Sequence, residues 1–248
     1  MMDNVWLVTG AAAFGAGALN AIAGGGSFLT FPALVFAGVP PLAANATSAA
    51  AVSPGYLGST LGFRAELGHI PRRVLQREVL VAALGGLIGA GLLLITPARL
   101  FSGLVPWLLL LATALFALGP VIAARRGGQG HPSWRLPGLM LVAIYGGYFN
   151  GGLGILLMAL YTLTGESRMN TVNALKNLNS FVLSWLSVAA FAWAGAIVWD
   201  QAVWMMVLAT AGGWSGARLA KRLPAHWVRW LVIATGLVMS GVFFSRLG

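Results

Sequence analysis

The chain is divided into long apolar runs, and most of its charged residues lie in the short segments between them. About 20 apolar residues form a helix long enough to cross a bilayer. The runs do not alternate polar and apolar residues, as the strands of a membrane barrel do. The pattern therefore predicts an all-α polytopic membrane protein. Aspartate, glutamate, lysine and arginine are absent from runs 5–23, 41–63, 79–98, 100–124, 136–164, 177–199 and 201–217.

The composition points to the same class. Hydrophobic residues make up 58% of the 248 residues and charged residues only 8%, whereas soluble domains contain about 25% charged residues. The chain has no cysteine, which excludes disulfides and thiolate-bound metals, and we expect no metal site and no cofactor. The first run is expected to be a mature transmembrane segment, because Asp3 precedes it where a secretory signal carries basic residues.

The net charge of +10 would suggest a nucleic-acid partner for a soluble protein. Here the basic residues gather in connections between apolar runs, and the positive-inside rule places such connections in the cytoplasm. We therefore expect no nucleic-acid partner, and a multi-pass protein of the cell inner membrane with both termini on the outer side. The three clusters are Arg64, Arg72, Arg73 and Arg77; Arg125, Arg126 and Arg135; and Arg218, Lys221, Arg222 and Arg229.

Two glycine-rich stretches of the first half recur in the second. Residues 85–89 (GGLIG) reappear 127 residues later as 212–216 (GGWSG). Residues 24–28 (GGGSF) align at the same offset with 151–155 (GGLGI). Matches in the same order at one offset indicate a duplicated unit of about half the chain.

The charges at the ends of matching segments give the two halves opposite directions. Segment 41–63 ends at a basic cluster, whereas its counterpart 171–195 begins beside basic residues. Two copies of a unit that run in opposite directions form an inverted-topology repeat, a common plan of secondary transporters. We therefore predict a single membrane domain of two inverted repeats, residues 1–124 and 125–248.

Each repeat is expected to contain about five apolar segments. The second segment of each set has about 11 residues, roughly 16 Å as a helix, which is half of a bilayer. Either the first two segments of each half form a hairpin that turns inside the membrane, or both cross it. The sequence leaves both readings open. The predicted segments are 5–23, 28–38, 41–62, 74–95 and 99–123, then 134–150, 154–164, 170–195, 200–217 and 226–245.

The glycine stretches interrupt apolar sequence, and they predict an anion site. Glycine lets the chain turn without side-chain obstruction. Ser27 is a candidate N-cap for the helix that follows, and helix N-termini attract anions. Two such N-termini facing the middle of the protein would bind an anion from both sides. The alternative is that the small residues only permit close helix packing, which is the expectation for Gly58 with Gly62 and for Gly85 with Gly89.

One basic residue lies within an otherwise apolar helix pattern. Asn173, Lys176, Asn177 and Ser180 follow i, i+3, i+4, i+7 spacing, so they share one helix face. A desolvated lysine beside amide and hydroxyl donors would bind an anion. The alternative is that Lys176 extends to the cytoplasmic headgroups. The candidate substrate-binding residues are Gly24, Gly25, Gly26, Ser27, Asn45, Thr47, Ser48, Gly152, Gly154, Asn173, Lys176, Asn177 and Ser180.

The stretches that carry these residues resemble the sulfite exporter TauE/SafE family, which is grouped with toluenesulfonate uptake permeases. They are "NAIAGGGSFLTFPALVFAGVPPLAANATSAAAVSPG" in the first half, and "GGYFNGGLGILLMALYTLTG" and "VNALKNLNS" in the second. The resemblance implies a secondary transporter or facilitator of small sulfur-containing anions, such as sulfite or organosulfonates. The second break departs from the glycine triplet, because Asn150 and Gly151 precede Gly152, Leu153 and Gly154.

Two other functions stay open: a permease for another small organic anion, such as a carboxylate, and a membrane subunit of a larger complex. An enzyme is not expected, because the acidic residues and histidines lie at or near segment ends and leave no intramembrane catalytic pair. The same placement predicts no intramembrane carboxylate for a proton relay or sodium site. The chain has no GxxxxGK[ST] phosphate loop, so it does not itself hydrolyse ATP.

Overall fold

The computed structural model describes residues 2–22, 24–125, 131–219 and 225–245, and in these ranges the regular structure is entirely helical. Arg126, Lys221 and Arg222 of the predicted basic clusters lie outside the described residues. The elements are α1 (Met2–Ile22), α2 (Ser27–Phe36), α3 (Pro41–Gly62), α4 (Arg64–Gly68), α5 (Arg72–Ile95), α6 (Ala98–Arg125), the short 3₁₀ turn η1 (Pro132–Trp134), α7 (Arg135–Tyr148), α8 (Leu153–Leu163), α9 (Met169–Trp193), α10 (Trp199–Leu219) and α11 (Ala225–Ser245).

Helix ends follow the proline and glycine positions. α3 begins with Pro41 directly after Pro40, and α5 begins after Pro71, positions where a missing N–H costs nothing and a fixed φ favours the first turn. α2 and α8 have 10 and 11 residues, so each is about 15 to 16 Å long. Their bounds lie close to the predicted ranges 28–38 and 154–164.

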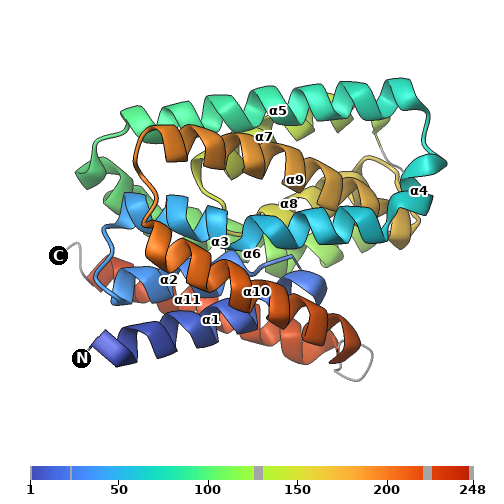
Figure 1. Ribbon diagram of the computed structural model, residues 1–248. Coiled ribbons are helices and arrows are strands. Elements are labelled where there is room, and N and C mark those ends of the chain that lie inside the picture. Colours follow the sequence, from blue (N-terminus) through green and yellow to red (C-terminus); the bar gives the residue numbers. More distant parts are fainter. Residues whose placement is uncertain (1, 23, 126–130, 220–224, 246–248) are drawn as a thin grey trace.

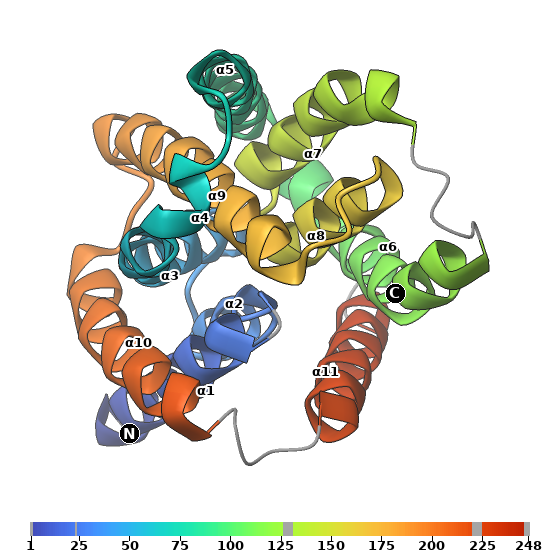
Figure 2. The ribbon, with the colours of Figure 1, turned by 90° about the vertical axis from the view of Figure 1, so that its right-hand side faces the viewer.

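The long helices run side by side as one bundle (Figure 1). α4 lies at one end of the bundle, which we call the α4 end, whereas α1 begins and α11 ends at the opposite end. Viewed from the α4 end, α5 and α7 cover one side, and α1 and α10 the other, with α2, α3, α8 and α9 between them (Figure 2). The main helix contacts are α1 with α10, α5 with α7 and α9, α3 with α9 and α10, and α6 with α11.

Glycine permits the closest of these contacts. A Cβ atom at Gly89 of α5 would lie only 2.7 Å from the backbone nitrogen of Tyr148, and one at Gly85 would overlap α7 as well. The packing expectation for this pair is confirmed. It is wrong for Gly58 and Gly62: a Cβ atom there would have no atom of the described residues within 4 Å, because that face of α3 points away from the other described helices.

Two helices of the described chain have both the length and the hydropathy of a membrane span: α5, over Arg72–Ile95, and α6, over Ala98–Leu115. α3 and α9 have 22 and 25 residues, but their asparagine, serine and threonine residues lower their hydropathy. Large apolar side chains such as Ile95, 78% exposed, cover the outside of the bundle. The fold is all-α, while the number of membrane segments and the inverted repeat stay predictions.

Candidate functional site

The two glycine breaks meet inside the bundle. Gly24 and Gly152 both have a φ of +78°, a left-handed conformation that glycine adopts without strain. The 127-residue offset aligns Gly24 with Gly151. The shared backbone angle instead makes Gly152, one residue further along, the structural counterpart of Gly24. A Cβ atom at Gly24 would lie 3.1 Å from the Cα of Gly154, so the break before α2 touches the start of α8. Gly24, Gly25, Gly26, Gly152 and Gly154 are all buried.

Asn150 connects the breaks to the neighbouring helices. The Ser27 hydroxyl donates a hydrogen bond to Asn150 Oδ1 over 3.0 Å, and Asn150 Nδ2 donates to the Ser184 hydroxyl of α9 over 3.4 Å. The Asn150 backbone N–H donates to Asn45 Oδ1, and Asn45 Nδ2 donates to the Tyr148 carbonyl over 3.0 Å. Sequence reasoning treated Asn150 only as a departure from a glycine triplet. Its position at the edge of the second break was the signal for this role.

The remaining first-half candidates separate into two groups. Ser48 shares a hydrogen bond of 2.6 Å with Thr30 of α2, so it lies beside the first break. Thr47 instead accepts a hydrogen bond from the Val198 N–H and holds the connection between α9 and α10. The N-cap prediction for Ser27 is wrong: Ser27 is the first residue of α2, and the N-cap residue is Gly26, which has no side chain to cap the helix. The Ser27 hydroxyl instead bonds to Asn150.

The candidate face of α9 is buried and lacks partners. Lys176 is 3% and Asn177 5% exposed, while Asn173 is half-buried. Neither the Lys176 ammonium nor the Asn177 amide forms a hydrogen bond or ion pair among the described residues. The Ser180 hydroxyl and Asn179 Oδ1 are buried without a partner. Buried polar groups usually have partners, and each unsatisfied one costs about 1–3 kcal/mol. The candidate face therefore carries a buried hydroxyl, that of Ser180, without a partner on the same side of α9 as Lys176.

This face joins the glycine breaks. Ser180 lies one turn before Ser184, whose hydroxyl accepts from Asn150. Polar residues continue along α9 at alternating spacings of three and four, which keeps them on one side of a helix. The series is Asn170, Asn173, Asn177, Ser180, Ser184 and Ser187.

A second buried polar cluster was missed by sequence reasoning. Glu78 of α5 is 0% exposed; its Oε1 lies 2.6 Å from Arg135 Nε. Its Oε2 accepts from the Tyr161 hydroxyl over 2.9 Å and from Asn179 Nδ2 over 3.1 Å. Glu78 lies near the start of α5, as the sequence predicts, but its side chain is buried inside the bundle. The signal was its spacing of seven residues from Gly85, which places it on the α5 face that packs on α7.

Sequence comparisons then place the chain among known proteins. The model of the family described as sulfite exporter TauE/SafE matches residues 9–243. The chain belongs to this family. It is a family of membrane transporters, and the chain is similar along most of its length to relatives named as probable membrane transporter proteins.

Three of these relatives give the extent of the similarity. A Sinorhizobium protein named probable membrane transporter protein ORF9 is 28% identical over 232 residues, which cover 92% of this chain and 88% of the relative. A Haemophilus influenzae relative is 28% identical over 92% of this chain and 89% of its own. The YfcA protein of Escherichia coli K12 is 27% identical over 91% and 84%. No solved structure matches this TauE/SafE family chain.

Proposed function

We propose that this TauE/SafE family protein is a secondary transporter or facilitator of small sulfur-containing anions, such as sulfite or organosulfonates, and that Lys176 binds the anion. The observation that carries the proposal is Lys176, a buried residue of 3% exposure whose ammonium has no counter-charge among the described residues. A buried charge is normally paired. An oxyanion would pair the ammonium and accept hydrogen bonds from Asn177 and the unsatisfied Ser180 hydroxyl.

The helix contacts support the proposed inverted repeat. If α1, α2, α3, α5 and α6 exchange places with α7, α8, α9, α10 and α11, the contact of α1 with α10 becomes that of α7 with α5. The contact of α3 with α10 becomes that of α9 with α5, and α3 with α9 and α6 with α11 map onto themselves. A two-fold relation between residues 1–124 and 125–248 produces this pattern. In transporters with inverted repeats, the substrate binds between the repeats.

The buried breaks support the hairpin reading of the short helices. A connection between two helices that both cross a membrane would lie at an end of the bundle. The breaks before α2 and α8 instead lie in the interior, where Gly24 contacts Gly154. Irregular backbone at membrane depth is tolerated where protein surrounds it or it lines a cavity. We therefore propose two hairpins that turn within the membrane, with both chain termini on the outer side.

The test substitutes Lys176 and measures binding of sulfite and methanesulfonate to the purified protein by calorimetry. Lys176→Met keeps the side-chain length and removes the charge. Removing one partner of a buried ion pair costs about 3–5 kcal/mol, which corresponds to a loss of several hundred-fold or more in affinity. Lys176→Arg keeps the charge in a larger planar group, so its loss is expected to be smaller. Affinity of Lys176→Met within about threefold of the unsubstituted protein refutes the assignment.

The same titrations separate the substrate classes. Acetate and sulfate are measured beside sulfite and methanesulfonate, with uptake into proteoliposomes as the transport readout. Tighter binding and faster uptake of acetate would assign the site to carboxylates and reject the sulfur-anion proposal.

A further inference from the structure

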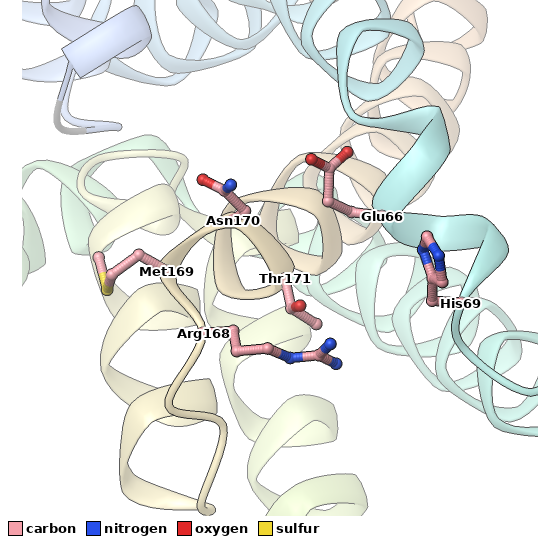
Figure 3. Close-up of a pocket in the computed structure, with 6 residues that line it drawn as sticks. All are labelled: Glu66, His69, Arg168, Met169, Asn170 and Thr171. Atoms are coloured by element: carbon pink, nitrogen blue, oxygen red, sulfur yellow. The ribbon is translucent and has the colours of Figure 1, made fainter.

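A cavity of about 510 Å³ opens at the α4 end of the bundle, where α4 meets the start of α9. Figure 3 shows the side chains that line it. It lies on the helix that carries Lys176 but involves none of the candidate substrate-binding residues. The lining residues are Glu66, His69, Arg168, Met169, Asn170 and Thr171.

The start of α9 offers this cavity several unused hydrogen-bond donors. The N-cap residue is Arg168, and no side chain caps the helix. The first amides of a helix have no acceptor within the helix, and those of residues 169–171 find none elsewhere in the described residues. Partial positive charge collects at this end of a helix.

Two side chains add to these amides. Thr171 is 3% exposed, lines the cavity, and its hydroxyl has no hydrogen-bond partner among the described residues. The guanidinium of Arg168, 68% exposed, has one loose contact, 3.6 Å from Glu166 Oε1. Arg168 and Thr171 extend to the same side of the helix (Figure 3). Thr171 is thus a buried residue whose unpartnered hydroxyl is left to the open cavity, beside a cation.

We propose that this cavity is a vestibule in which the transported oxyanion binds first, held by Arg168, the Thr171 hydroxyl and the first amides of α9, before it moves to Lys176. The inference rests on the proposed function. An arginine fork and helix-terminal amides suit an anion with several oxygen atoms. The carboxylate of Glu66 in the same cavity repels the anion and prevents tight binding there. The anion can therefore leave the vestibule for Lys176.

The path from the vestibule to Lys176 is short and polar. Thr171 and Lys176 are five residues apart, about 7.5 Å along a helix axis. Asn170 lines the vestibule, and Asn173 and Asn177 follow it on one face. Their side chains change from exposed to half-buried to buried. Amide groups at each step can replace part of the hydration shell that an anion loses as it enters.

The experiment compares Arg168→Gln/Thr171→Val with the unsubstituted protein in proteoliposomes and in detergent. Radiolabelled sulfite well below saturation gives kcat/KM for uptake, and calorimetry gives the Kd of the Lys176 site. Electrostatic steering changes association rates by about tenfold or more, so the double variant should lose about tenfold in kcat/KM while the Kd is unchanged. Its uptake should also depend less on salt, because salt screens exposed charges.

Glu66→Gln provides the matched control within the same cavity. It removes the opposing charge, so kcat/KM should rise while the Kd again stays unchanged. Unaltered uptake in the double variant, or reduced uptake in Glu66→Gln, overturns the vestibule. A weaker Kd in the double variant also overturns it, because the cavity would then not be separate from the inner site. If Lys176→Met binds sulfite normally and Arg168→Gln/Thr171→Val does not, the anion binds at the α4 end of the bundle. The assignment of Lys176 as the binding residue would then be wrong.

Discussion

The ion pair between Glu78 and Arg135 should stabilise the fold, and each partner should contribute differently. Glu78 Oε1 has Arg135 as its hydrogen-bond donor, whereas Oε2 has the donors Tyr161 and Asn179. Arg135→Met therefore leaves a fully buried carboxylate with two donors but no counter-charge. Breaking a buried pair from one side costs about 3–5 kcal/mol, and the two remaining donors place this case near 3 kcal/mol.

The reverse substitution should cost less. Glu78→Gln keeps the shape of the side chain, and the Arg135 side chain it leaves behind is 22% exposed, so water can solvate part of the guanidinium. We expect a loss of about 1–2 kcal/mol. The double variant Glu78→Gln/Arg135→Met has no unpaired charge and should lose about as much as Glu78→Gln alone. The cycle then gives a coupling free energy of about 3 kcal/mol, the loss expected for Arg135→Met alone.

The assay is equilibrium unfolding in mixed micelles with increasing SDS, followed by tryptophan fluorescence and extrapolated linearly to zero SDS. Arg77→Met is the control: Arg77 precedes Glu78 but is exposed, and surface changes usually stay within about 0.5 kcal/mol. If the single losses simply add in the double variant, or Arg135→Met behaves like the control, the pair does not stabilise the fold.

Two further predictions concern the breaks and the topology. Asn150→Ala should lower the free energy of unfolding by at least about 2 kcal/mol, because it leaves the buried Ser27 and Ser184 hydroxyls without their partner. An unchanged unfolding midpoint would contradict the role of Asn150. In a chain without native cysteine, His69→Cys at the α4 end should react with an impermeant thiol reagent only from the cytoplasm, and Ala194→Cys at the opposite end only from outside. Reaction of both from one side rejects the proposed orientation.

The helices could be predicted from local signals, since each depends on nearby residues. Apolar runs fix where a helix exists, and proline and glycine fix where it ends. α3 begins and ends at residues 41 and 62, as predicted, because Pro40 precedes it, Pro41 opens it and a charged connection follows. The five-residue helix α4 was not predicted, since a single turn within a charged connection leaves no periodic pattern.

The candidate site could be predicted only in part. Helical spacing placed Lys176, Asn177 and Ser180 on one face, and the structure places all three among the buried residues. Spacing does not say which helix lies opposite that face. The roles of Asn150 and Glu78 depend on partners 123 and 57 residues away along the chain, and no local pattern encodes such pairs.

Several charged residues of one half correspond to uncharged residues in the other half, and this difference bears on how an anion could bind. At the offset of 128 residues that relates Gly24 to Gly152, Lys176 corresponds to Ser48 and Arg168 to Pro40. At the offset of 127 that relates the later glycines, Glu78 corresponds to Met205, which is fully buried in an apolar core. Packing at the Glu78 position therefore does not require a charge. Close packing of the glycines alone does not explain why one half has charged residues where the other half has uncharged ones. If the proposed anion binds between the two repeats, one cation is enough to pair with it, and Lys176 of α9 is the cation that we propose.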